Sequence, residues 1–462
     1  MKAGTKWISL SVVSSASLLA AAQVNASGFA LQEQNVSGLG NAYAGSAAVA
    51  EDASTVFFNA AGMTQLDKAS VVVSLIDLNL NSKFRNSSSV NGLAQPLGGE
   101  GGNAGGNSII PALYASLPFG SKFAVGLGIN APFGLKTEYA NDWMGRFQAA
   151  KSEVKTTNIN PAFAFKPNNV VSFSVGVDYQ KLDAELNNNV NFDAVAAQVL
   201  AAQSVPQASI NALLGANPGL QGSSSVKGND SKWGYDLGIL ITPTPQTKIG
   251  LSYRSAINYH VTGNATIVAP TSSNATMQAV ISGAKATALA DGPITLDIKL
   301  PGSARFAVSH QLDNDLELLA EVSWTQWSTV QALTIVRTSG TVLKNTPENW
   351  DDTWRVAIGG NYKVNSNFKL RAGIAIDSSP VSDAYRTARL PDNDRIWVSL
   401  GAQWNIGSSF VLDVGYAHLF TSDASLSQSD GYSASQGYPN GLLVGTQKSS
   451  INMLGAQATF KF

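Results

Sequence analysis

The feature that most constrains this 462-residue chain is a series of segments, each about ten residues long, in which apolar and polar side chains alternate. In residues 395–406, every second side chain from Ile396 to Ile406 is apolar, and Trp397 is the one large exception between them. After the first 26 residues no apolar run reaches the roughly 20 residues that a membrane-spanning helix needs. Because only helices and closed barrels satisfy every backbone hydrogen bond in hydrocarbon, such a chain enters a membrane only as a barrel.

About fourteen alternating segments follow one another, and an even number of strands is typical of single-chain bacterial outer-membrane barrels. They start near residues 68, 108, 121, 149, 170, 230, 247, 293, 315, 351, 367, 394, 408 and 447. Short turns alternate with long loops, as expected for periplasmic and extracellular connections. We therefore predict an all-β fold, a transmembrane antiparallel β-barrel of about 14 strands over residues 67–462, in the outer membrane of a Gram-negative cell.

The composition agrees with a membrane protein. Only 13% of the residues are charged, about half the usual share for a globular protein. The formal net charge is −1 and predicts no nucleic-acid partner. The chain has no cysteine, which excludes disulfides, thiolate metal sites and a cysteine nucleophile. We expect no cofactor, no metal and a monomer surrounded by outer-membrane lipid.

Two segments precede the strands. Residues 1–26 have the charged start, apolar middle and small-residue end of a secretory signal peptide, although a membrane anchor helix is the alternative. Residues 27–66, which we call the hatch, are rich in Gly, Ala and Asn and have no sustained period. Such a segment cannot build a core of its own, so we expect it to plug the lumen of the barrel.

Two long loops carry helical patterns, one around residues 192–214 and one around residues 277–289. Their apolar faces fit either packing on each other and on the barrel rim, or an apolar groove that first captures a hydrophobic ligand.

Enzyme motifs are missing from the sequence. It contains no GxSxG, HExxH or P-loop pattern. The three histidines, His260, His310 and His418, are far apart in sequence, so only a lipase assembled by the fold stays open as an enzymatic alternative. We predict that the protein is not an enzyme.

Charged residues on the inward stripes are expected to form a hydrogen-bonded network around the hatch, with transient binding of a carboxylate as the alternative. These residues are Arg254, Arg305, Glu317, Glu321, Arg355, Lys369, Arg371 and Asp413. Most Trp and Tyr residues are candidates for the aromatic belts at the bilayer edges. Trp397 and Trp327 break the outward register and are expected to face the interior. In the hatch, Phe29, Phe57 and Phe58 are candidate apolar ligand contacts or simply packing residues.

Several motifs resemble the FadL family of outer-membrane transport proteins, which includes the TodX-type hydrocarbon channels. They are SGFALQEQNVSGLGNAYAG at residues 27–45, APFGL at 131–135, TTNINPAFAFK at 156–166, AIDSSPV at 375–381 and LPDNDRIW at 390–397. The resemblance implies a 14-stranded barrel with a hatch in the lumen and lateral diffusion of a hydrophobic substrate into the bilayer beside a kinked strand. It also implies a ligand pocket with ionisable groups, with Asp377 at a polar position and Lys344 as its basic partner.

The sequence departs from the family at the end of the hatch, where Asn59 is followed by Ala60 and Ala61 instead of Pro-Ala. Loss of proline frees the backbone angle and restores an N–H donor, so how this end is held is open.

Three functions remain at this point. The first is passive outer-membrane transport of long-chain fatty acids or similar lipophiles, with capture by extracellular loops and release by rearrangement of the hatch. The second is a channel for aromatic or alkane hydrocarbons, which needs no cation for a head group. The third is an open general porin, against which the hatch argues.

Overall fold

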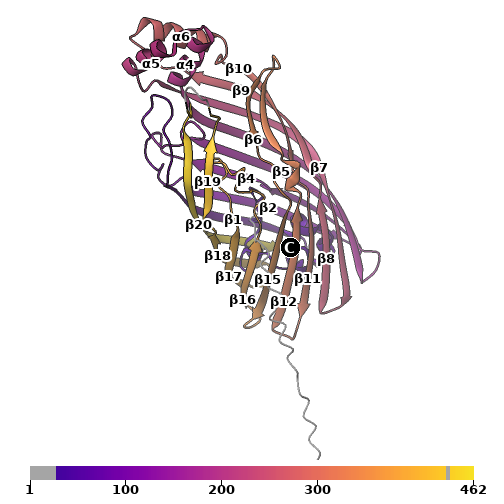
Figure 1. Cartoon of the computed structure of the whole chain (residues 1–462). Helices are drawn as coiled ribbons and strands as arrows, with labels where there is room; N and C mark the ends of the chain where they lie inside the picture. The colour runs from indigo at the N-terminus through magenta and orange to yellow at the C-terminus, as the bar shows by residue number, and fades with distance from the viewer. Residues whose placement is uncertain (1–27, 433–436) are drawn as a thin grey trace, which may run out of the picture.

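The structure, a computed structural model, describes residues 28–432 and 437–462. The predicted signal peptide lies outside the described residues. Strands dominate the chain and run at a steep tilt around one closed wall (Figure 1).

Fourteen antiparallel strands form the barrel. In order around the wall they are β1 Ser70–Asn86, β2 Gly106–Phe119, β3 Phe123–Asn130, β5 Lys151–Phe165, β6 Val171–Asn191, β7 Gln221–Thr244, β8 Thr247–Arg254, β11 Ser303–Gln311, β12 Leu316–Thr325, β15 Thr353–Lys363, β16 Phe368–Asp377, β17 Arg395–Ile406, β18 Phe410–Thr421 and β20 Leu442–Lys461. The last strand, β20, pairs with β1 and closes the ring. The predicted fold class and strand number are confirmed.

One predicted strand start is wrong. The segment near residue 293 is β10 Gly292–Leu300, which lies outside the ring and pairs with β9 Ile257–Val268 and β13 Ala332–Arg337. The barrel strand is the next one, β11, beyond the Pro301-Gly302 break. Alternation marks a strand with two different faces, but it does not say whether the apolar face meets lipid or a protein neighbour.

The extra strands extend the wall beyond the long-loop end. Besides β9, β10 and β13, they are β4 Gly134–Glu138, β14 Val342–Pro347 and β19 Ala424–Ser429. Three helices cap this end in Figure 1: α4 Phe192–Ala202, α5 Gln207–Ala216 and α6 Ala275–Ala286. Their apolar faces pack on one another around Phe192, Ile210 and Met277, all buried. The helical patterns of the two loops therefore correspond to helices that pack on one another.

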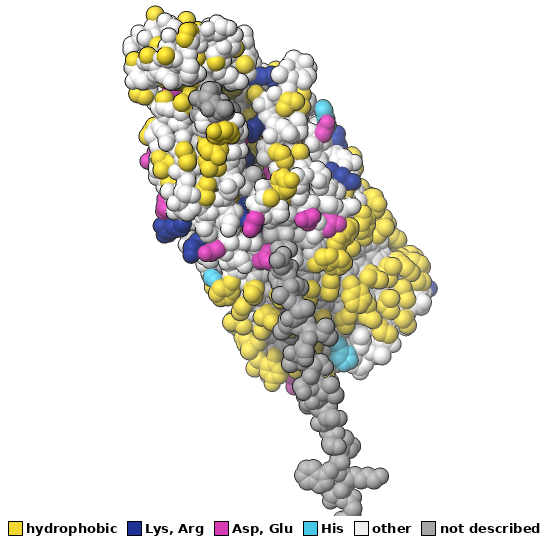
Figure 2. Space-filling model, in the orientation of Figure 1, with side chains coloured by type: hydrophobic (Ala, Val, Ile, Leu, Met, Phe, Trp, Pro, Cys, Tyr) yellow, Lys and Arg dark blue, Asp and Glu magenta, His cyan; other side chains and the backbone are white. Residues whose placement is uncertain are grey.

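The outward side chains of the barrel strands form the lipid-facing surface. Ile396, Val398 and Leu400 of β17 are exposed, whereas Ser399 between them is buried. Figure 2 shows hydrophobic side chains gathered in a band over the short-turn half of the visible face, with charged side chains beyond the band. Trp397 and Trp327 are fully buried, as their positions in the alternation predict.

Residues 28–66 lie inside the barrel. They form four short helices, α1 Val36–Leu39, α2 Ser46–Val49, α3 Thr55–Asn59 and the 3-10 helix η1 Ala60–Gln65. Inward glycines on the strands let the hatch backbone approach closely. A Cβ at Gly373 would lie 2.1 Å from Asn41 O, and one at Gly250 would lie 2.0 Å from Ala47 O. The inward glycines, which alternate with outward apolar residues on these strands, thus leave room for the hatch backbone.

The remaining helix, η2 Trp327–Thr329, follows β12 at the long-loop end. No helix in residues 28–432 and 437–462 is long and apolar enough to cross a bilayer.

We predict that Leu400→Arg lowers the free energy of unfolding by about 2–4 kcal/mol, because an arginine near the middle of the lipid-facing surface must leave water for hydrocarbon. Urea unfolding in lipid vesicles measures the change. Leu312→Arg is the matched control, since Leu312 is exposed in the short turn between β11 and β12. Equal losses for the two variants would show that the surface around Leu400 does not face hydrocarbon.

Candidate functional site

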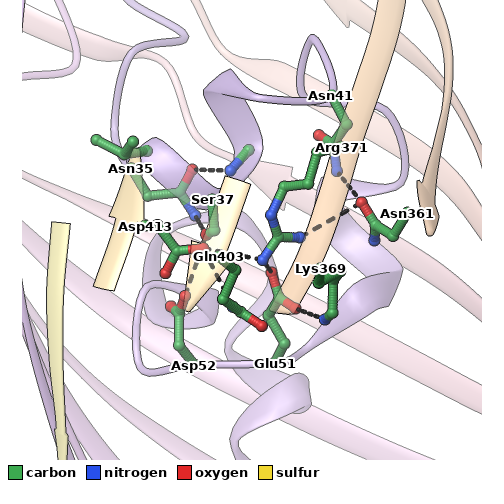
Figure 3. A network of polar contacts seen from close by, with 12 residues as sticks. Asn35, Ser37, Asn41, Glu51, Asp52, Asn361, Lys369, Arg371, Gln403 and Asp413 are labelled. Atoms are coloured by element: carbon green, nitrogen blue, oxygen red, sulfur yellow. Dashed lines mark hydrogen bonds and ion pairs between the residues drawn. The ribbon is translucent and has the colours of Figure 1, made fainter. Parts of the chain in front are cut away.

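Buried ion pairs hold the middle of the hatch to the wall (Figure 3). Arg371 of β16 places Nη2 2.7 Å from Glu51 of the hatch and 3.0 Å from Asp413 of β18. Lys369, two residues along β16, places Nζ 3.0 Å from the other oxygen of Glu51. Arg371 was a predicted ligand contact, but its guanidinium is already shared between two carboxylates.

A second set of hydrogen bonds joins the start of α1 to β20. Gln457 of β20 accepts a hydrogen bond from Val36 N at 2.9 Å and donates one to Asp52 at 2.9 Å. Asp52 also accepts from Ser37 Oγ at 3.1 Å, and Asn35 donates to Ser37 at 3.0 Å. The hatch therefore folds back on itself as it attaches to the wall.

Arginine residues on the opposite wall contact the second half of the hatch. Arg305 pairs with Glu321 at 3.3 Å, and Glu321 accepts a 2.7 Å hydrogen bond from Ser46 Oγ. Arg254 pairs with Asp178 and donates to Phe57 O at 3.2 Å, with its guanidinium over the Phe57 ring. These inward charges thus form the hydrogen-bonded network around the hatch that the sequence predicts.

The side chain of Asn59 holds the end of the hatch, where Ala60 stands at the position of the family's proline. Asn59 Nδ2 donates to Ala47 O at 2.8 Å and to Ile239 O of β7 at 2.9 Å, while its Oδ1 accepts from Ala61 N at 3.2 Å. Ala60 has φ −62°, the angle that proline would impose. Ala60 and Ala61 are both buried, so the turn keeps its geometry without the ring.

A cavity of about 630 Å³ lies between the start of the hatch and the wall formed by β1, β2, β4 and β5. Hatch residues 28–31 form one side of it, and apolar side chains such as Leu78, Ile110 and Leu135 form the other. A few polar groups converge on it, among them Glu33, Asn130 and Arg395. An apolar cavity of this size with few polar groups is typical of a site for a small hydrophobic ligand.

The same cavity reaches the lipid-facing surface through a gap in the strand ladder. Within the described pairings, residues 106–112 of β2 pair with β1 alone, because β3 ends at Asn130 and β4 pairs only with β5. Ile109 and Leu75, both exposed on the outer face, line the cavity. We call this gap, between residues 106–112 of β2 and β4, the side opening.

The hatch is bonded directly to the break between β3 and β4. Leu31 N donates to Pro132 O at 2.8 Å, and Gly134 N donates to Phe29 O at 3.0 Å. Gln34 Nε2 adds a 2.9 Å hydrogen bond to Ala131 O. Movement of residues 29–34 therefore changes contacts at the edge of the side opening.

Four aromatic rings meet where the hatch begins. Phe29 lies 4.9 Å from Trp327 and 5.9 Å from both Phe133 and Trp350, measured between ring centroids. All four residues are buried. Phe29 and Phe133 also line the cavity, so part of this aromatic cluster forms one of its sides.

Asp392 and Arg395 fix the first described residue of the hatch. Gly28 N donates to Asp392 at 3.0 Å, and Arg395 Nη2 donates to Asp392 at 2.6 Å and to Gly28 O at 3.2 Å. Both side chains line the cavity. They stand in the LPDNDRIW motif, but the sequence alone did not single them out, because their partner is a hatch residue more than 360 positions away.

The structure brings three predicted site residues together beside the hatch. Trp397 Nε1 donates to Asp377 at 3.3 Å, and the Arg355 guanidinium lies over the Trp397 ring at 5.0 Å. Arg355 Nη2 also donates to Ala42 O at 2.7 Å. Phe57 and Phe58 pack on the far side of the hatch, and they do not line the 630 Å³ cavity.

Lys344 is not part of this group. It lies on β14, which pairs with β13 beyond the barrel rim, and its Nζ is 2.6 Å from Asp430 in a long loop. Its side chain is 43% exposed. The predicted pairing of Lys344 with Asp377 is wrong, because the hairpin carries the lysine away from the lumen.

Comparisons with known proteins agree with this geometry. A family model described as outer membrane protein transport protein (OMPP1/FadL/TodX) matches residues 17–462. The 47 kDa outer membrane protein of Pasteurella multocida is 29% identical over all of both chains. The long-chain fatty acid transport protein of Escherichia coli O6:H1 is 27% identical over 90% of this chain and 92% of its own. A solved Pseudomonas aeruginosa FadL homologue has a TM-score of 0.82 over 94% of this chain and 100% of that chain, at 24% identity, and shows the shared fold.

A 14-stranded barrel with an internal hatch and an apolar cavity defines a stoppered channel of the outer membrane. The chain belongs to the OMPP1/FadL/TodX family of outer membrane transport proteins. It is a transporter of hydrophobic compounds and not an enzyme.

We predict that Arg371→Gln lowers the free energy of unfolding by about 3–5 kcal/mol, because Glu51 and Asp413 lose the buried cation between them. Denaturant unfolding in vesicles measures the loss. Arg85→Gln is the control, since it removes an exposed pair with Glu100 and should leave stability unchanged. A stable Arg371→Gln variant would mean that the hatch does not depend on this ion pair.

Proposed function

We propose that the protein carries long-chain fatty acids by passive diffusion from the outer surface, through the cavity, and sideways into the membrane. The single observation that supports this most is the 630 Å³ apolar cavity, which runs from the hatch to lipid-facing side chains through the side opening. Burying apolar surface stabilises a bound chain by about 0.8 kcal/mol per CH₂, and the bilayer offers the same environment at the exit. No coupled energy source is needed for this path.

The bonds between the hatch and the β3–β4 break support the release step. A ligand that displaces Phe29 also strains the hydrogen bonds from residues 29–34 to residues 131–134. Loss of those bonds frees the edge of the side opening. The proposed order is therefore entry past the aromatic cluster, residence in the cavity, rearrangement of the hatch start, and exit between β2 and β4.

A fatty acid is favoured over a hydrocarbon as the substrate because charged groups converge on the cavity. Arg395 offers a bidentate donor suited to a carboxylate, and it lines the cavity beside apolar side chains. The printed name of the Escherichia coli relative, long-chain fatty acid transport protein, points the same way. An aromatic or alkane hydrocarbon is the second candidate, supported by the largely apolar lining. An open porin is disfavoured because the hatch fills the lumen.

We predict that Ala112→Trp reduces oleate uptake about tenfold, because the indole would occupy much of the cavity beside the side opening, which Ala112 lines. Uptake of labelled oleate into cells that lack other fatty-acid transporters measures this. Ala320→Trp is the matched control, since Ala320 is exposed on the outer face of β12. Full uptake by a folded Ala112→Trp variant would contradict the path.

We predict that Arg395→Gln weakens oleate uptake at least tenfold and changes toluene uptake less than twofold, because a hydrocarbon has no carboxylate to pair with. Competition between labelled oleate and toluene in the same cells measures the difference. Lys344→Gln is the control, as Lys344 lies outside the cavity. Equal loss of both substrates would favour a purely structural role for Arg395, and no loss of oleate would favour the hydrocarbon channel.

A further inference from the structure

Glu33 places a buried carboxyl group at the cavity, and its own backbone N–H donates to that group. It is the only acidic or basic residue between residues 28 and 50. Its side chain is 4% exposed and lines the cavity. Among the residues that the structure describes, its Oε2 is buried and has no hydrogen-bond partner. A buried polar atom without a partner is unfavourable, so this position would gain from a ligand that pairs with the carboxyl group.

The backbone around Glu33 is held firmly. Gln34 Nε2 donates to Leu31 O and Ala131 O, both at 2.9 Å, and Gln34 O accepts from Tyr114 Oη at 3.1 Å. These bonds hold Gln34 and the adjoining backbone in place beside the cavity.

The charges facing Glu33 are already balanced. Arg395 and Arg355 are the nearby cations, and Asp377 is the nearby anion. Arg395 is paired with Asp392, and Arg355 donates to Ala42 O. Two arginines thus face two aspartates, and the neighbouring Tyr43 hydroxyl donates to Asn35 O. An ionised Glu33 would leave this buried group with one excess negative charge.

The hatch does not itself span the membrane, and the surroundings of Glu33 in the lumen favour its neutral form. Burial raises the pKa of the Glu33 carboxyl to about 7 and Asp377 adds to the rise, whereas the hydrogen bond from its own backbone N–H, Arg395 and Arg355 oppose it. A proton on Glu33 makes its carboxyl group a hydrogen-bond donor on a residue that lines the apolar cavity. A fatty-acid carboxylate is an acceptor that can use it, whereas a hydrocarbon is not.

We propose that protonated Glu33 is a specificity-determining residue that donates a hydrogen bond to the carboxylate of the bound fatty acid. This inference rests on the proposed function. On binding, the ionised acid leaves water and one proton from water binds Glu33. The two carboxyl groups then share that proton in the cavity. The bound site, with one ionised and one protonated carboxyl group, therefore carries the same net charge as the empty site with Glu33 ionised.

The proton taken up is measurable. In the mature protein in lipid nanodiscs, calorimetric titration with dodecanoate in two buffers of different ionisation enthalpy should show uptake of about 0.9 proton at pH 8 and about 0.1 at pH 6, given a carboxyl that titrates near 7. Dodecanoate affinity should weaken about eightfold from pH 6.5 to pH 8 by the same linkage. Dodecan-1-ol should show almost no pH dependence, because its hydroxyl pairs with either form of Glu33.

Glu33→Gln keeps a hydrogen-bond donor and removes the titration. It should bind dodecanoate within about threefold of the unmodified protein at pH 6 and take up no proton at pH 8. Glu100→Gln makes the same chemical change in an exposed loop and should behave as the unmodified protein. Infrared difference spectra of the unmodified protein at pH 8 provide a test independent of any variant: dodecanoate should produce a protonated-carboxyl band.

Failure of the role of Glu33 and failure of the proposed function give different results. Dodecanoate binding without proton uptake at pH 8, or uptake that persists in Glu33→Gln, would overturn the role of Glu33 and leave fatty-acid transport standing. Failure of the unmodified protein to bind dodecanoate at any pH while it binds toluene would overturn the proposed function itself, and the inference with it.

Discussion

The need to satisfy every backbone hydrogen bond within hydrocarbon governs this molecule. A closed antiparallel ladder of fourteen strands meets that need, and β20 completes it by pairing with β1. The side opening is then a costly feature, because the edges of β2 and β4 lose partners there. Hatch residues 29–31 supply part of the missing bonding to residues 132–134. The barrel wall and its hatch are in this sense one hydrogen-bonded system.

Polar contacts attach the middle of the hatch to the wall, whereas mainly apolar side chains line the cavity. Different residues therefore anchor the hatch and form the cavity. Arg371, Glu51 and Asp413 form a buried ion-pair group at the middle of the hatch. Phe29 and its aromatic neighbours pack at its start, beside the cavity. In the proposed function, residues 28–34 therefore rearrange while the ion pairs hold the rest of the hatch.

Glu33 of the hatch, Asp392 just before β17 and Arg395 at its start are among the polar groups that line the cavity. Asp392 and Arg395 bind the backbone of Gly28, and Glu33 faces the same space from the hatch. A ligand that competes for these groups acts on the hatch directly. In the proposed function, the groups that meet the head group are thus also groups that hold the start of the hatch.

Much of the fold follows from local pattern. Alternation along Ile396–Val398–Leu400 gives both the strand and its lipid face, because the side-chain period of a strand is two wherever it lies. The same rule placed Trp397 inside, whereas Trp327, also buried, lies on the 3-10 helix η2. The rule failed at residue 293, where β10 has alternating side chains but is not a barrel strand and pairs with β9 and β13. Periodicity shows that a strand has two unlike faces, but it does not show what each face contacts.

The sequence by itself determined a membrane barrel of about fourteen strands, an N-terminal hatch and the absence of enzyme motifs. Only the tertiary structure decided which charges serve the hatch and which face the cavity. Arg371 and Lys344 are both cations near apolar strands in the sequence, yet one is buried against Glu51 and the other extends from a hairpin toward Asp430. The physical reason is that an ion pair depends on distances set by closure of the whole ring, and no local window of sequence contains that closure.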